Sequence, residues 1–156
     1  MEMKNYIMMV TGRSCEEKKE TAKLIARLLP NTELNIYEDI IEGKRKRDPS
    51  KAAVFLASVH DSLKNKKNNL SVAGFEKEIL REAFYRTAYL WQANVLCLGY
   101  GSLCIKSEEL LKNPSVSYLK YNDGGIQRVR INPETSYLVD SLEQILAPVE
   151  EERKSL

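Results

Sequence analysis

Histidine, cysteine and long apolar runs are scarce in this sequence, and their scarcity excludes several classes of protein. The one histidine, His60, excludes a metal site built from several histidines. The three cysteines, Cys15, Cys97 and Cys104, form no CxxC pair, and their odd number favours a reducing compartment over a disulfide framework. No apolar run reaches the roughly 18 residues of a membrane-spanning helix, and the run 6–10 is too short for a signal-peptide core. We therefore expect a cytoplasmic chain with no membrane partner.

The net charge is also small, because 24 lysines and arginines face 22 aspartates and glutamates, which gives +2. That total hides two stretches of opposite net charge. Residues 44–67 hold eight basic and two acidic residues, whereas residues 134–156 hold six acidic and two basic residues. Hydrophobic residues make up 43% of the 156 residues, enough for one packed core. We expect a single domain over 1–149 and a charged, frayed tail over 150–156.

Apolar patterning and capping residues predict the first elements of the chain. Residues 6–10 form a short continuous apolar run, which is typical of a buried strand. A helix is predicted from Ser14 to about Leu29, because Ser14 suits the N-cap position and Glu17 completes a capping box.

The middle of the chain carries the strongest periodic pattern. Apolar residues recur every three or four positions over 75–98 and predict a long amphipathic helix, with Gly99 as its C-terminal cap. Before it, the continuous apolar run 52–59 predicts a buried strand, and a helix over 51–63 is the competing interpretation. A polar loop is predicted over 64–69.

Turn residues organise the last third of the sequence. The glycine-rich stretch 122–125 predicts a hairpin between strands at 118–121 and 126–131. A last helix is predicted over 133–146. Strands interspersed with helices predict an α/β or α+β fold, a single-domain sandwich with a mixed sheet and the long central helix 75–98.

The predicted turn between the first strand and the first helix holds Thr11, Gly12, Arg13 and Ser14. Amide groups at a helix N-terminus bind phosphate, and an arginine adds a bidentate contact. Neither GxxxxGK[ST] nor GxGxxG is present here. Two interpretations stay open, an anion site and an ordinary strand-to-helix turn with a capping serine.

A second candidate is the basic run formed by Lys44, Arg45, Lys46 and Arg47, which opens the basic stretch 44–67. Such a run is typical of a surface that meets phosphate backbones or an acidic protein. A solvated loop is the alternative, because no aromatic residue alternates with these cations to stack on bases.

A glycine turn follows the long predicted helix and leads into an apolar run that ends at Ile105. The residues of this turn are Leu98, Gly99, Tyr100, Gly101 and Ser102. Together with the apolar run 52–59, the segment 52–105 resembles the central part of the flavin-dependent nitroreductases. An arginine-serine pair before a helix is also similar to that family.

The resemblance implies a flavin cofactor, FMN, whose hydride chemistry belongs to the cofactor itself. It also implies a homodimer that forms through the long helices. The residues that it assigns to cofactor binding are Arg13, Ser14, Gly99, Gly101 and Ser102.

Three functions stay open at this point. The first is a small nitroreductase-like protein that binds a flavin or another phosphorylated aromatic ligand. The second is a non-catalytic accessory module whose basic stretch 44–67 contacts nucleic acid or an acidic partner protein. The third is an enzyme that acts on a nucleotide, with its phosphate site at the turn 11–14. The sequence assigns no catalytic residue and predicts no metal site.

Overall fold

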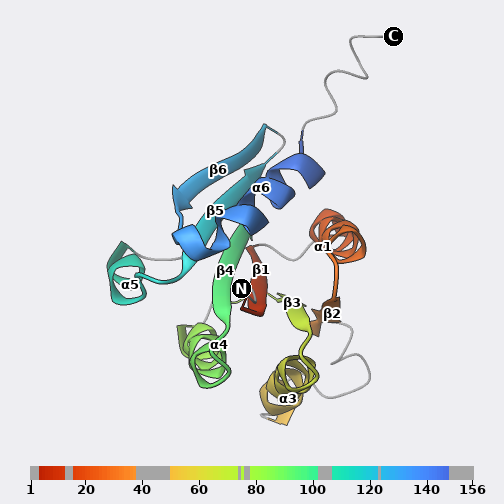
Figure 1. The fold of residues 1–156 in the computed structure, drawn as a ribbon, viewed down its shortest axis with the longest axis vertical. Coiled ribbons are helices and arrows are strands. Elements are labelled where there is room, and N and C mark those ends of the chain that lie inside the picture. Colours follow the sequence, from red (N-terminus) through yellow and green to blue (C-terminus); the bar gives the residue numbers. More distant parts are fainter. Residues whose placement is uncertain are drawn as a thin grey trace.

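The structure is a computed structural model, and it describes residues 4–12, 16–37, 50–73, 75, 78–101, 107–122 and 124–147. These residues form one six-stranded sheet in the order β2-β3-β1-β4-β5-β6 (Figure 1). Neighbouring strands from β2 to β5 are parallel, and β6 is antiparallel to β5. The elements are β1 (Tyr6–Gly12), α1 (Glu16–Leu28), β2 (Thr32–Ile36), α3 (Ser50–Lys64), β3 (Asn68–Val72), α4 (Glu78–Leu90), β4 (Asn94–Tyr100), α5 (Ser107–Lys112), β5 (Ser117–Asn122), β6 (Gly125–Arg130), the 3-10 turn η1 (Pro133–Thr135) and α6 (Ser136–Ile145).

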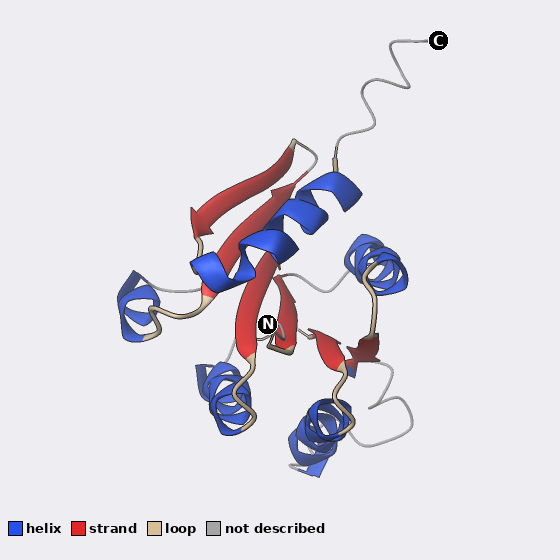
Figure 2. Ribbon diagram, in the orientation of Figure 1, coloured by secondary structure: helices blue, strands red, loops and turns tan. Residues whose placement is uncertain are grey.

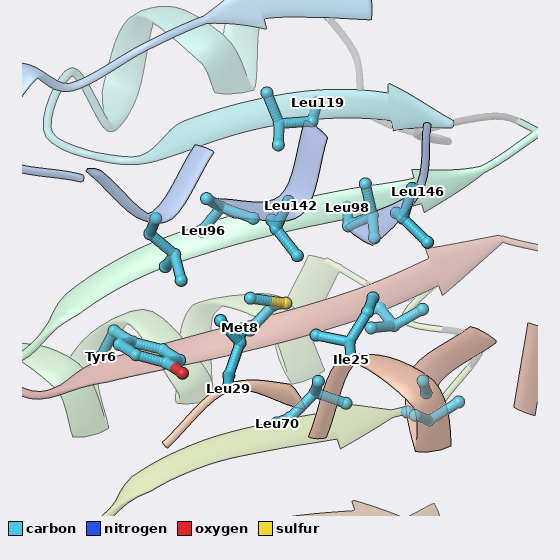
Figure 3. Packing of buried hydrophobic residues seen from close by; sticks show 14 of the residues in the cluster. Tyr6, Met8, Ile25, Leu29, Leu70, Leu96, Leu98, Leu119, Leu142 and Leu146 are labelled. Carbon is cyan, nitrogen blue, oxygen red and sulfur yellow. The ribbon is translucent and has the colours of Figure 1, made fainter. Parts of the chain in front are cut away.

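Helices cover both faces of the sheet, with α1 and α6 on one side and α3 and α4 on the other (Figure 2). Side chains alternate along a strand, so β1 contributes to both cores. Met8 and Val10 pack with α1 and α6, whereas Ile7 and Met9 pack with α3 and α4. Figure 3 shows the first core, where Met8 lies among Leu70 of β3, Leu96 of β4 and Leu29, which follows α1. Because β1 is buried on both faces, its sequence reads as a continuous apolar run.

The structure confirms the α/β class and the mixed sheet that the sequence predicts. The run 6–10 lies within β1, the hairpin forms from β5 and β6, and the last helix is present as η1 and α6. Within the described parts of the chain, no helix is long and apolar enough to cross a membrane. The predicted tail 150–156 lies outside the described residues.

The strand predicted over 52–59 is wrong, because this segment belongs to helix α3. Its buried residues Phe55, Val59 and Leu63 recur at every fourth position, so they form one face of a helix against the sheet. The competing helical interpretation over 51–63 is therefore confirmed.

The predicted polar loop 64–69 overlaps strand β3, which the sequence does not reveal. Asn69 and Ser71 are fully buried in this strand, so polar residues stand at positions where a buried strand usually has apolar ones. Their side chains are hydrogen-bonded, because Ser71 Oγ donates to Asn69 Oδ1 at 2.5 Å and Asn69 Nδ2 donates to Ser62 Oγ at 3.3 Å. Internal polar contacts thus replace the apolar pattern of a buried strand.

The long helix predicted over 75–98 is shorter than expected. Helix α4 ends at Leu90, and the following residues turn into strand β4. Gln92 adopts a left-handed φ of 53° at this turn, so it takes the place that the sequence assigns to Gly99. Gly99 itself lies buried inside β4.

Candidate functional site

The carboxyl ends of the adjacent parallel strands β1 and β3 lie side by side, and we call the place just beyond them the crevice, after the position at which open α/β sheets bind ligands. Strands β1 and β3 are parallel neighbours, and Val10 pairs with Val72 near their ends. After β1 the chain continues to α1 on one face of the sheet, and after β3 it continues to α4 on the other face (Figure 1). Ligands of open α/β sheets bind at such points, where successive connections leave in opposite directions.

The side chain of Lys18 lies at this crevice. Its position is the third residue of α1, and its exposed fraction is 0%. Lys18 Nζ donates to the carbonyl oxygen of Gly12 at 3.0 Å and to that of Ala73 at 3.3 Å. An ammonium group is expensive to bury, so proteins bury one where polar partners hold it or where function requires it. Lys18 therefore brings a positive charge to the ends of both strands.

Gly12 closes β1 beside Lys18 in a conformation that favours glycine. Its φ is 107°, and a Cβ built on it would lie 2.4 Å from the carbonyl oxygen of Tyr100. Gly12 is therefore needed for the close approach of β1 to β4.

Thr11 supplies a second polar group at the end of β1. Ile7 and Met9 face α3 and α4, so Thr11 faces the same side by strand alternation. The residue is fully buried, and its Oγ1 has no hydrogen-bond partner among the residues that the structure describes. Buried hydroxyl groups are usually bonded, so this oxygen has capacity for a ligand or a water molecule.

The chain after β3 is fixed in an unusual conformation near the crevice. Phe75 has a left-handed φ of 51°, which is uncommon for a bulky residue. Its ring packs on Phe84 at a centroid distance of 5.0 Å, and its carbonyl oxygen accepts a hydrogen bond from Arg81 Nη1. The buried Arg81 is in turn paired with Glu109, whose Oε1 lies 2.9 Å from Arg81 Nε. These contacts hold the segment that carries the Ala73 carbonyl.

Cys97 and two tyrosines form a buried polar group on the α4 side of β4. Tyr85 and Tyr118 share a hydrogen bond between their hydroxyl groups at 3.2 Å. Burial raises the pKa of the Cys97 thiol to about 12 and that of Tyr118 to about 12, and it raises the pKa of Tyr85 further. Cys97 is therefore a protonated core thiol rather than a nucleophile.

The structure describes only part of the predicted site residues. Thr11 and Gly12 of the predicted phosphate turn lie at the crevice, whereas Arg13 and Ser14 lie outside the described residues. Gly99 pairs with Thr11 in the sheet, and Gly101 is exposed with its amide donating to Tyr121 O at 2.8 Å. Ser102 and the basic run Lys44, Arg45, Lys46 and Arg47 also lie outside the described residues, so the predicted basic surface stays a prediction.

Lys18 is the site residue that the sequence analysis misses, although two signals point to it. It stands four residues before Ala22 on the stripe that continues through Ile25, so helical periodicity alone predicts its burial. It also follows Gly12 at the spacing that separates the first glycine from the lysine in GxxxxGK[ST]. The motif is incomplete because Glu17 replaces its second glycine and Lys19 replaces its serine or threonine.

No family model and no curated protein matches this sequence. Solved structures share its fold at low identity. A chain of the Pnkp1/Rnl/Hen1 complex gives a TM-score of 0.56 at 20% identity and covers 87% of this chain and 49% of that one. A candidate kinase from Chloroflexus aurantiacus gives 0.54 at 12% identity, covering 72% and 68%. A mutant APS kinase of Mycobacterium tuberculosis gives 0.52 at 16% identity, covering 90% and 98%.

These likenesses show a common fold, and they overturn the nitroreductase hypothesis. The segment 52–105 that suggested it holds α3, β3, α4 and β4 in place of a strand, a loop and a long helix. The similar structures include proteins named as kinases, and none of those reported above is a nitroreductase. The FMN prediction rests on that resemblance alone and is untested, and the predicted homodimer also stays a prediction.

Proposed function

We propose that this chain binds the phosphates of a nucleoside triphosphate at the crevice between β1 and β3. Lys18 is the charged ligand in this proposal. The observation that carries it is the fully buried ammonium group, which donates to the carbonyl oxygens at the ends of two adjacent strands.

A phosphate oxygen is a suitable partner for this ammonium group. Hydrogen bonds between ionised groups are roughly twice as strong as those between neutral groups, so a phosphate can replace a carbonyl at Lys18 Nζ with a gain. Helix α1 has 13 residues and begins beside the crevice, so its positive end adds to the attraction. The exposed acids Glu16 and Glu17 in its first turn oppose an anion, and we therefore expect moderate rather than tight binding.

The fold likeness supports a nucleotide as the molecule that carries these phosphates. Two of the similar structures are named as kinases, the class of enzyme that binds a nucleoside triphosphate as phosphoryl donor. The third hypothesis from the sequence, a nucleotide site near the turn 11–14, is therefore the one that we retain.

Calorimetric titration of the protein with ATP and with inorganic tripolyphosphate tests the proposal. We expect both ligands to bind the wild-type chain, and Lys18→Met to weaken binding by on the order of tenfold or more through loss of a charged hydrogen bond. Lys23→Met is the matched control, because Lys23 lies exposed on the same helix and pairs with the exposed Glu20 at 3.4 Å. We expect it to bind as the wild type does.

Lys18→Arg covers the case in which Lys18→Met fails to fold. This variant keeps the positive charge at position 18. Competition between ATP and tripolyphosphate for the wild-type chain tests whether both ligands bind the same site, and it requires no substitution. Absence of binding by both ligands to the folded wild-type protein would contradict the proposal, and so would equal losses in the Lys18 and Lys23 variants.

A further inference from the structure

A hollow lies at the amino ends of the strands, at the opposite end of β1 from the crevice. Its volume is about 530 Å³, within the roughly 300–1,000 Å³ of small-molecule sites. Residues at the start of β1, in the turns before β2 and β3, and in α6 line it. Tyr6 lines the hollow and Gly12 ends β1 at the crevice, about 20 Å away, because a strand rises about 3.3 Å per residue. The hollow is therefore separate from the crevice.

Part of the wall of the hollow is apolar. Leu29 and Leu138 line it and are buried, and they belong with Tyr6 to the first core, where Figure 3 shows Tyr6 and Leu29. Tyr137 of α6 lines the same hollow and is 37% exposed, so it keeps surface that a ligand can cover. Two tyrosine rings with two leucines favour a ligand with a flat apolar body.

The two tyrosines also offer polar atoms of opposite kinds. Thr32 Oγ1 donates to the carbonyl oxygen of Pro30 at 3.1 Å, so it is the Tyr6 hydroxyl that donates in its 2.6 Å contact with Thr32 Oγ1. The Tyr137 hydroxyl has no hydrogen-bond partner among the residues that the structure describes. Burial raises the pKa of Tyr137, so this hydroxyl keeps its proton at neutral pH and can donate it to a ligand.

Lysines supply the charge at the hollow. Lys4 and Lys66 line it, and none of the described lining residues is acidic. Lys4 Nζ lies 3.6 Å from the exposed carboxylate of Glu134. The exposed Lys66 pairs with no carboxylate in the described part of the chain, and its backbone is held because its carbonyl oxygen accepts from Asn31 Nδ2 at 2.9 Å. The ammonium group of Lys66 is thus available to an anion.

We propose that the hollow is a second ligand site, which binds a small organic anion with a flat apolar body, an aromatic carboxylate in chemical class. The apolar body packs on the rings of Tyr6 and Tyr137, the carboxylate accepts from the Tyr137 hydroxyl, and Lys66 supplies the countercharge. Three independent features of one hollow carry this proposal: its apolar wall, an unpartnered hydroxyl and an unpaired ammonium group. It does not rest on the triphosphate site.

Amide NMR of the full chain during titration with 2-naphthoate, and with its neutral analogue 2-naphthamide, tests the proposal. We expect saturable shift changes at the amides of Tyr6, Asn31 and Tyr137, and a dissociation constant about threefold or more lower for the carboxylate. Lys66→Gln is expected to raise the 2-naphthoate constant about threefold. Lys64→Gln is the matched control, because Lys64 is exposed at the end of α3 and does not line the hollow.

A further variant and a competitor test the place of binding. Ser141→Trp puts a large ring into the hollow and is expected to abolish 2-naphthoate binding, with thermal unfolding as the check that it folds. Saturating ATP is expected to leave the 2-naphthoate constant unchanged. The proposal is overturned by an absence of saturable shifts at the hollow, by equal constants for carboxylate and amide, by equal effects of the two lysine variants, by unchanged binding to folded Ser141→Trp, or by displacement with ATP. An absence of ATP binding leaves it standing.

Discussion

At the scale of single residues, Gly12 carries the clearest structural constraint at the candidate site. A Cβ on Gly12 would lie 2.4 Å from the carbonyl oxygen of Tyr100, and the positive φ of 107° adds backbone strain for any other residue. We expect Gly12→Ala to lower the free energy of unfolding by about 2 kcal/mol or more, measured by urea denaturation.

Gly101 provides the matched control for this prediction. It also has a positive φ, 80°, but a Cβ there would meet nothing within 4 Å. Gly101→Ala is therefore expected to lower the free energy of unfolding through backbone strain alone, by about 1 kcal/mol. Equal losses in the two variants would show that the approach of β1 to β4 does not require a glycine.

The sequence reveals only part of the candidate site at this scale. Gly12 can be predicted because turn glycines are recognisable between a strand and a helix. Lys18 is harder to predict because lysines are rarely buried, and because Glu17 and Lys19 break the motif that marks such a residue. Thr11 gives no signal at all, since its burial and the lack of a hydrogen-bond partner for its Oγ1 among the described residues depend on contacts made by distant segments.

At the scale of elements, the buried pair of Arg81 and Glu109 joins α4 to α5. Arg81 Nε lies 2.9 Å from Oε1 and 3.2 Å from Oε2 of Glu109, and both side chains are about 6% exposed. Removal of one partner leaves the other charge buried, so Arg81→Met is expected to destabilise the fold by about 3–5 kcal/mol. The double variant Arg81→Met/Glu109→Leu buries no charge and is expected to lose less than the single variant in urea denaturation. A double variant at least as unstable as Arg81→Met would contradict this account.

The prediction of elements from the sequence succeeds where one pattern dominates and fails where two patterns join. The run 6–10 and the hairpin at 122–125 have clear boundaries, and the structure confirms both. Over 75–98 the apolar spacing of α4 runs on into the buried residues of β4, and a glutamine rather than a glycine makes the turn between them. Short-range periodicity carries no information on such a boundary, because the sheet contacts of β4 with β1 decide it.

At the scale of the whole molecule, the buried acids of the α4 side predict how stability depends on pH. Burial raises the pKa of the Cys97 thiol from its ordinary 9.0 to about 12 and that of Tyr118 from 10.0 to about 12. At a pH between the ordinary and the raised pKa of each group, that group has lost its proton in the unfolded chain and keeps it in the folded chain. The free energy of unfolding therefore falls as pH rises, from about pH 9 for Cys97 and from about pH 10 for Tyr118, by about 1.4 kcal/mol per pH unit for each group.

Urea denaturation at several alkaline pH values checks this dependence. The variant Cys97→Ala removes one of the titrating groups, so its stability is expected to fall less steeply just above pH 9 than that of the wild type. Stability that stays constant from about pH 8 to about pH 11 would contradict the assigned directions of the pKa shifts.

The central claim is that a triphosphate binds at the carboxyl ends of β1 and β3, and amide NMR during an ATP titration in EDTA tests it most directly. The account predicts saturable shift changes at the amides of Gly12, Lys18 and Ala73, which surround the ammonium group. Changes centred instead on Lys66 and Tyr137, which line a hollow near the amino ends of the strands, would contradict it. A spectrum that ATP leaves unchanged would contradict it equally.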